Sequence, residues 1–461
     1  MKKLINLTAR VLLLPFIFLF IFSCEDFTET DMPQSQLTGP AVFEDVSTAN
    51  AALSDIYARL REGSVSAGTQ LGGTTLFANY ADDMDFYGTN VDIEQFNKHT
   101  VLPSNTLLTN LWNTSYGEIY AVNALIEGVQ NSTVITGEDR NRLLGEAMFI
   151  RAFIHFYLVN IYGDIPYITT IDYEANTTVS KMAQTQVYEL IVSDLTEAET
   201  FLPESYPSEY RVRVSKAAAL AMLARVYLYI EDYEKARNYA TAVINNSLYS
   251  VEPNLALAFL KESPSIIWSF HPGIAGLNTK DARAYIFSSG PPTKAALAVN
   301  LRNAFESGDI RQTSWIRTIT DGTDVWYQAY KYKKSSVTEP SQEYTIVLRI
   351  EEQHLIRAEA RAILGDITGA QQDLNMTRNR AGLPNTTANT TTSLKAAILQ
   401  ERRFEFFCEQ GHRWFDLKRT GNAGTALSPI KPGWQNTDVL LPLPETEILL
   451  NSNLLPQNPG Y

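Results

Sequence analysis

The sequence predicts an all-α-dominated fold, in which tetratricopeptide-type helix pairs form a scaffold that carries large irregular loop insertions and few short strands. Three observations lead to this prediction. The chain of 461 residues is 45% hydrophobic and 19% charged, which is the composition of a globular protein with a large core. Helical periodicity recurs along much of the sequence, and two segments repeat the pattern of a helix pair. Two long stretches punctuated by glycine, proline and aromatic residues interrupt it.

The chain begins with the pattern of a targeting segment. Basic residues precede an apolar run over residues 11–22, which is shorter than the roughly 20 residues that span a bilayer as a helix. This layout is typical of a signal peptide, which we predict over residues 1–23. The segment ends in Ile-Phe-Ser-Cys, which resembles the bacterial lipobox and predicts lipidation of Cys24. The alternative is an ordinary secretory signal followed by an incidental cysteine.

A polar segment separates this cysteine from the rest of the chain. Residues 24–40 contain two prolines and show no hydrophobic period, so we expect a flexible tether after the lipidated Cys24. Residues 41–461 are then predicted to form a single helical domain.

Helical periodicity defines the body of this domain. Residues 215–244 read as a buried helix followed by an amphipathic one, with the break at Glu231-Asp232. Residues 354–380 repeat the design, because Ala358, Asp366 and Ala370 have the same spacing as Ala224, Asp232 and Ala236. Small residues at these positions let two antiparallel helices approach closely, as in tetratricopeptide repeats. Weaker helical segments are predicted over residues 46–60, 111–130, 139–162, 184–202 and 394–410.

Two regions break the helical pattern, over residues 63–105 and 262–345. Both exceed the length of ordinary connections and are punctuated by glycine or proline among aromatic residues. Long insertions on a rigid scaffold are where binding sites tend to lie, so these two irregular stretches are the candidate binding regions.

The C-terminal part of the chain resembles a known family. Residues 398–419 read ILQERRFEFFCEQGHRWFDLKR and residues 441–461 read LPLPETEILLNSNLLPQNPGY. Both resemble signature segments of the SusD/RagB family, and residues 111–126 and 145–168 are similar to its early helices. The resemblance implies a SusD-like fold over residues 41–461.

The same resemblance implies a function and a location. Family membership would make the chain a surface-exposed, lipid-anchored lipoprotein of the outer membrane of Bacteroidetes. It would capture oligosaccharides or peptides for import and deliver them to a SusC/RagA-type TonB-dependent transporter, and it would catalyse no reaction. The alternative is a helical-repeat scaffold protein of an outer-membrane complex, without a nutrient ligand of its own.

Sugars present apolar C–H faces and hydroxyl rims, so their sites combine aromatic rings with polar groups. Both irregular stretches offer that mixture, and the resemblance supports this location without singling out residues. The candidate ligand-binding residues are Tyr80, Asp83 and Tyr87 in the first stretch and Trp268, Trp315, Trp326 and Tyr327 in the second. The alternative for each aromatic residue is a core contact, above all for Trp268 in the apolar, strand-like segment 266–270.

The sequence gives little support for catalysis, metal binding or nucleic-acid binding. Glu401 and Glu405 could be read as a glycosidase pair, but flanking arginines should lower both pKa values, which favours structural ion pairs. Asp82, Asp83 and Asp85 lack the spacing of a calcium loop, and a solvated acidic turn is preferred. The net charge of −13 without a basic run argues against a nucleic-acid partner. We therefore predict no catalytic residue, no metal ligand and no cofactor.

Overall fold

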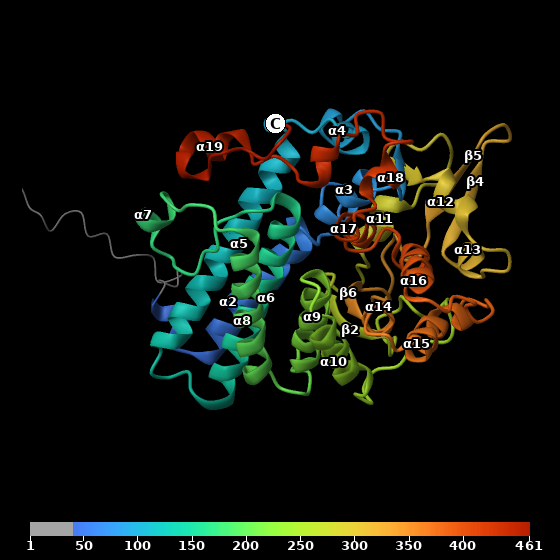
Figure 1. Cartoon of the computed structure of the whole chain (residues 1–461). Helices are drawn as coiled ribbons and strands as arrows, with labels where there is room; N and C mark the ends of the chain where they lie inside the picture. Colours follow the sequence, from blue (N-terminus) through green and yellow to red (C-terminus); the bar gives the residue numbers. More distant parts are fainter. Residues whose placement is uncertain (1–39) are drawn as a thin grey trace, which may run out of the picture. The chain divides into compact units, whose positions relative to one another are not determined.

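The computed structural model of the protein describes residues 40–461. The predicted signal peptide, Cys24 and the tether up to residue 39 lie outside the described residues. Residues 43–461 form one compact unit, which helices dominate (Figure 1).

The helices agree with the segments predicted from periodicity, and several short helices are added. The elements are η2 (Pro40–Phe43), α2 (Val46–Gly63), α3 (Gly73–Tyr80), α4 (Val91–Lys98), α5 (Thr106–Asn131), α6 (Gly137–Tyr162), α7 (Tyr173–Asn176), α8 (Gln184–Phe201), α9 (Lys216–Tyr229), α10 (Tyr233–Ile244), α11 (Lys280–Tyr285), α12 (Val299–Ala304), α13 (Arg311–Ser314), α14 (Ile350–Ile363), α15 (Ile367–Arg380), α16 (Thr391–Phe406), α17 (His412–Arg419), α18 (Ala423–Leu427), η3 (Asn436–Val439), α19 (Glu445–Leu450) and η4 (Ser452–Leu454). The first irregular stretch is more ordered than predicted, because it contains α3 and α4.

Six short strands form two sheets within the described residues. The strands are β1 (Met84–Phe86), β2 (Ile266–Phe270), β3 (Ala295–Leu297), β4 (Ile316–Thr320), β5 (Val325–Ala329) and β6 (Thr345–Arg349). One sheet has the order β1-β3-β5-β4, and the other pairs β2 with β6 antiparallel.

The two predicted helix pairs, α9–α10 and α14–α15, share their turn geometry. Asp232 caps α10 by accepting a hydrogen bond from the N–H of Lys235 (3.1 Å), and Asp366 caps α15 in the same way from Gly369 (2.9 Å). The residue before each cap has a left-handed backbone, with φ of 63° at Glu231 and 87° at Gly365. The repeated spacing therefore reports a repeated structure.

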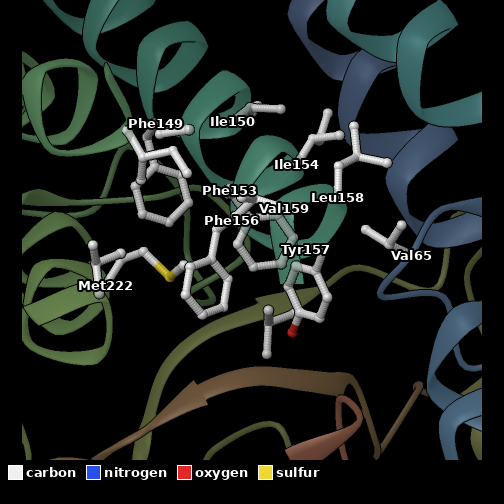
Figure 2. Close-up of a cluster of buried hydrophobic side chains, with 14 of the residues drawn as sticks. Val65, Phe149, Ile150, Phe153, Ile154, Phe156, Tyr157, Leu158, Val159 and Met222 are labelled. Carbon is white, nitrogen blue, oxygen red and sulfur yellow. The ribbon is translucent and has the colours of Figure 1, made fainter. Parts of the chain in front are cut away.

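The main core surrounds α6. Phenylalanine side chains of this helix lie on the side of Met222 of α9, and its Leu158 lies beside Val65, which precedes α3 (Figure 2). Among residues 40–461, α6 is the one helix long and apolar enough to cross a membrane, and that apolar part lies fully buried inside the protein. A helix that is apolar on every side is expected at the centre of a large domain.

Candidate ligand-binding site

The two irregular stretches meet in one sheet. β1, from the first stretch, pairs antiparallel with β3, from the second, so that Met84 lies opposite Leu297. β3 then pairs with β5, and β5 with β4, which lie at the right of Figure 1. The fold therefore brings the two candidate binding regions together.

Strand alternation divides the side chains of this sheet between two faces. Met84, Leu297 and Tyr327 are in register across three strands, and this inner face packs against a core cluster. Asp85 and Trp326 are each displaced by one residue from that row, so they belong to the opposite face, here called the outer face. Trp326 and Tyr327 consequently point to different faces and cannot both contact one ligand.

Tyr87 lies just beyond β1 and continues the outer face. Its backbone N–H donates a hydrogen bond to the carbonyl of Lys294 (2.7 Å), and its side chain is 42% exposed. Partial burial raises the pKa of the Tyr87 hydroxyl, and the negative charge of nearby Asp85 adds to the rise. Tyr87 and Asp85 thus form one small aromatic and acidic surface.

Trp326 adds an indole to this face and remains half-buried. A Cβ atom at Gly290 would lie only 2.0 Å from its ring, so the indole rests on backbone where any larger residue would collide with it. Ala296 and Gln328, which lie on this face between Asp85 and Trp326, are buried. The candidate site is therefore the set of outer-face residues that reach solvent, Tyr87, Asp85 and Trp326, here called the outer-face group.

Asp85 is the member of this group that sequence reasoning missed. The signal that could have found it is the alternation of Asp83, Met84 and Asp85, in which a buried Met84 separates two acids. Because alternation sends Asp83 and Asp85 to the same side of an extended chain, only the neighbouring structure decides which one reaches solvent.

Two predicted residues of the first stretch are core residues, which corrects their assignment to ligand binding. The Tyr80 ring packs edge-on against Trp414 (4.6 Å between ring centres), and its hydroxyl donates a hydrogen bond to the Asp438 carbonyl (2.9 Å). The Asp83 carboxylate accepts a hydrogen bond from the N–H of Cys408 (2.9 Å). Both side chains are fully enclosed by protein, so neither can touch a ligand.

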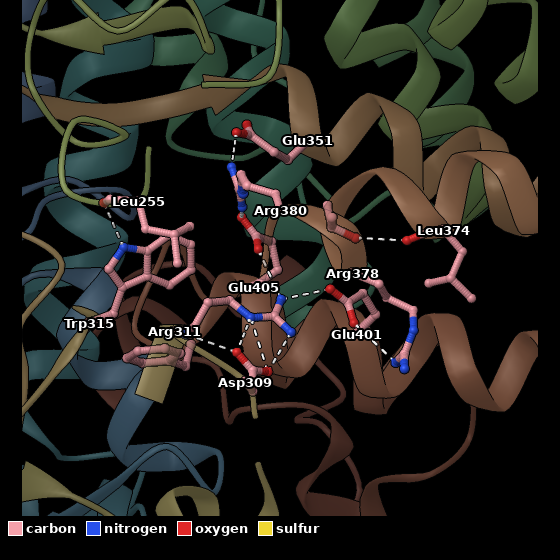
Figure 3. Close-up of polar contacts among 12 residues, drawn as sticks. Leu255, Asp309, Arg311, Trp315, Glu351, Leu374, Arg378, Arg380, Glu401 and Glu405 are labelled. Atoms are coloured by element: carbon pink, nitrogen blue, oxygen red, sulfur yellow. Dashed lines mark hydrogen bonds and ion pairs between the residues drawn. The ribbon is translucent and has the colours of Figure 1, made fainter. Parts of the chain in front are cut away.

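The same correction applies to two tryptophans of the second stretch. Trp268 in β2 lies between Phe149 and Phe153 of α6, with ring centres 5.3 and 5.1 Å away. Trp315 is equally buried, and its indole N–H donates to the carbonyl of Leu255 (3.1 Å, Figure 3). The polar residues around Trp315 in sequence gave a false signal of exposure, because neighbours such as Thr313 and Arg317 are exposed while Trp315 itself points into the core.

Tyr327 has an intermediate position on the inner face. It is half-buried against the core cluster, and the guanidinium group of Arg302 lies 5.3 Å from its ring centre. Its ring is therefore occupied by a protein cation on one side.

Buried ion pairs hold the first stretch onto α16 and α17. Asp82 accepts hydrogen bonds from Arg413 (2.6 and 2.9 Å) and from Arg403 (2.7 Å). Burial opposes ionisation of Asp82, but both arginines lower its pKa below the usual value. The expected solvated acidic turn is therefore wrong, because Asp82 and Asp83 are buried. Residues 40–461 contain no group of three His, Cys, Asp or Glu side chains arranged to hold a metal ion.

In the second stretch the charges are reversed: its cations pair with carboxylates of the C-terminal segment. Arg311 donates hydrogen bonds to Glu401 (2.7 Å) and Glu405 (3.1 Å) of α16 and pairs with Asp309 (2.8 Å, Figure 3). Lys331 donates to Glu409 (2.5 Å). Burial opposes the charge of Arg311, but the surrounding carboxylates raise its pKa above the usual value.

Glu401 and Glu405 form buried ion pairs with arginines, which is a structural role. Arg380, Arg349 and Arg311 surround Glu405 and lower its pKa against the effect of burial. The expectation of a lowered pKa is wrong for Glu401, where burial outweighs Arg311 and raises it. Both carboxylates are enclosed in the core.

Comparisons with known proteins agree with this architecture. A SusD-like family described as "Starch-binding associating with outer membrane" matches residues 31–228, and the SusD family matches residues 275–461. SusD-like protein P2 of Formosa agariphila is 28% identical over the full length of both chains.

Solved structures show the same fold. A SusD superfamily protein from Bacteroides vulgatus has a TM-score of 0.80 at 20% identity, covering 91% of this chain and 99% of the other. A "Laminarin binding SusD-like protein" has a TM-score of 0.75 at 25% identity, covering 90% and 99%. Two SusD-like family models match the two halves of the chain, and one SusD-like relative matches it over its whole length, so the chain belongs to the SusD/RagB family.

Proposed function

We propose that this protein captures oligosaccharides on the outer face of the β1-β3-β5-β4 sheet and delivers them to a SusC/RagA-type TonB-dependent transporter. The observation that carries the proposal is the outer-face group itself. Tyr87 and Trp326 offer aromatic surface for the apolar face of a sugar ring, and the Asp85 carboxylate accepts hydrogen bonds from sugar hydroxyls.

The relatives support a saccharide as the ligand. One structural neighbour is named as laminarin-binding, and the description of one matching family speaks of starch. A peptide is the alternative ligand, and it would be recognised through its backbone amides as well as its side chains. An exposed carboxylate on the same sheet face as two aromatic rings suits a ring of hydroxyl donors better than it suits an extended backbone.

The rigid support of the outer face contributes to binding. Ion pairs on both irregular stretches fix the sheet against α16 and α17 before any ligand arrives. A preformed surface loses less conformational entropy when it binds, so modest stacking contacts retain more of their energy.

The test is to replace both exposed rings. The double variant Tyr87→Ala/Trp326→Ala should bind laminarin or starch oligosaccharides at least tenfold more weakly than the full-length wild type in detergent, measured by titration calorimetry. Val325→Ala is the matched control, because Val325 is a 46% exposed residue of β5 next to Trp326. Unchanged saccharide affinity in the double variant would reject the outer face as the capture site.

Anchoring is part of the same proposal. Lipidation of Cys24 would hold the protein on the outer membrane, with the helical domain exposed at the cell surface. Cys24→Ala should leave the protein folded and release it from the membrane fraction of cells that lack the transporter. Retention of this variant in the membrane would contradict lipid anchoring at Cys24.

A groove on the helical repeats favours the scaffold alternative. It has a volume of about 660 Å³ and lies between α8, α9 and α10, with Tyr188, Tyr227 and Lys235 in its lining. If the protein is a pure scaffold, the outer-face group should bind no saccharide in the wild type. Changing the exposed Glu189 of this groove to Arg should then abolish binding of the protein partner.

A further inference from the structure

An aromatic pocket lies far from the outer face. It has a volume of about 450 Å³ and is bordered by α5, α7, α19 and the loop that follows α6. Figure 1 shows α7 and α19 at the left of the view and β4 and β5 at the right. A volume of this size falls within the range of small-molecule pockets.

Four aromatic side chains line this pocket. Trp112 and Tyr116 form its inner part, where Trp112 is buried and the Tyr116 hydroxyl donates a hydrogen bond to the carbonyl of Pro166 (2.9 Å). Tyr120 and Tyr173 stand at the rim with 50% and 77% of their surface exposed. The pocket thus combines fixed rings inside with free rings at the entrance.

Polar groups lie among these rings. The side-chain amide of Asn176 donates to the carbonyl of Thr170 (2.9 Å), while its oxygen has no hydrogen-bond partner within residues 40–461. Asn113 is exposed at the pocket. Such amides can both donate to and accept from hydroxyl groups.

The charge of the lining selects against anions. Glu447 is its one charged residue, and the lining contains no Lys, Arg or His. Burial raises the pKa of the Glu447 carboxyl, while a hydrogen bond from Trp112 opposes that shift. A phosphate, sulfate or uronate group would meet a carboxylate here without any cation to pair with.

We propose that this pocket is a second ligand site, which binds a neutral saccharide. Stacked rings with amides and one carboxylate match the apolar faces and hydroxyl rims of uncharged sugars. The site shares no residue with the outer-face group, so it extends the proposed function without depending on it. Two separated sites would hold one polymer at two points, which raises avidity beyond either affinity alone.

The experiment compares four forms of the full-length protein in detergent: wild type, Tyr87→Ala/Trp326→Ala, Tyr120→Ala/Tyr173→Ala, and the variant with all four changes. The probes are neutral oligosaccharides of glucose, mannose, xylose and galactose, laminarihexaose and maltohexaose included, in an array-binding assay. Hydroxyl-radical footprinting then measures the reactivity of Tyr120 and Tyr173. Leu449→Ala is the matched control, because Leu449 is 78% exposed on α19 and does not line the pocket.

The expected result is that Tyr87→Ala/Trp326→Ala retains binding of at least one probe, which protects Tyr120 and Tyr173. Adding Tyr120→Ala/Tyr173→Ala should weaken that remaining binding at least tenfold, whereas Leu449→Ala should not. The proposal is overturned if the two rim tyrosines stay fully reactive at saturating saccharide, or if the wild type binds no probe. Protection of these tyrosines by the transporter alone would also overturn it and would assign the pocket to a protein interface. If Tyr120→Ala/Tyr173→Ala loses all saccharide binding, the pocket remains assigned as a saccharide site and the assignment of the outer face as the capture site is rejected.

Discussion

The first irregular stretch offers carboxylates to the C-terminal helices, whereas the second offers mainly cations. Asp82 pairs with Arg403 and Arg413, while Arg311 and Lys331 pair with glutamates of the same C-terminal segment. One segment, from Glu401 to Arg413, therefore holds both stretches through charges of opposite sign. This complementarity fixes which stretch docks where, since exchanging their places would bring like charges together.

The two docking arrangements also differ in how completely they exclude water. The side chains of Arg311 and Glu405 are wholly buried, and Glu405 also pairs with Arg349 and Arg380. Arg403 and Arg413 keep 12% and 9% of their side-chain surface exposed. Removing one partner should therefore cost more stability in the second stretch than in the first, because a stranded buried charge has no access to solvent.

The largest effect is expected from Arg311→Met. This change leaves three carboxylates without their shared cation, and it should lower the free energy of unfolding by about 3–5 kcal/mol. Urea-induced unfolding of the full-length protein in detergent measures it. Arg317→Met is the matched control, because Arg317 is an exposed arginine of the adjacent strand β4. Equal stability of the two variants would show that the buried network contributes nothing specific.

A smaller effect is expected from Asp82→Asn, which removes the charge shared by Arg403 and Arg413. We expect a loss of about 3 kcal/mol, the lower end of the range for a broken buried pair, because both arginines retain contact with water. The same unfolding assay compares it with Asp324→Asn in the exposed β4–β5 hairpin. A loss larger than that of Arg311→Met would reverse the order of the two stretches.

The smallest and most specific effect concerns the pH dependence that Asp83 imparts. Burial, together with the charge of Asp82, raises the pKa of Asp83 to about 6 from a usual value near 3.8. The folded protein thus holds this proton more tightly than the unfolded chain, so Asp83 reduces stability progressively as pH rises from about 4 to about 6.

Asp83→Asn abolishes this titration while keeping an oxygen that can accept the Cys408 N–H. The unfolding free energy of the variant relative to wild type should therefore rise by at most about 3 kcal/mol between pH 4 and pH 7. Thermal or urea unfolding at four or five pH values measures that difference. Parallel pH profiles for the two proteins would show that Asp83 has an ordinary pKa in the folded state.

Local sequence predicted the helical framework well. The spacing of Ala224, Asp232 and Ala236 located one helix pair, and its repetition located the other, because capping and close helix packing depend on residues near one another in the chain. The C-terminal motifs likewise identified the family. The predicted bounds of the two irregular stretches enclose the strands β1 and β3 that join them, although the helices α3 and α4 within the first stretch were not predicted.

The candidate site was predicted less well, for a definite reason. Tyr80 and Tyr87 stand in one aromatic and acidic run, yet one is buried beneath Trp414 and the other reaches solvent. Trp315 and Trp326 show the same contrast. Exposure of a side chain depends on which distant segment covers it, and a single sequence does not state that.

Periodicity, caps and long motifs are local properties, and they were enough to predict the helix pairs, the family and the two regions of interest. That the two stretches share a sheet, and that Asp85 lies on its outer face, became clear from the folded chain. The folded chain also shows that Asp82 is an ion-pair partner and that Trp268 and Trp315 belong to the core. Strand pairing and charge pairing join residues from the two irregular stretches and the C-terminal helices, and their energies depend on burial that arises only when these segments pack together.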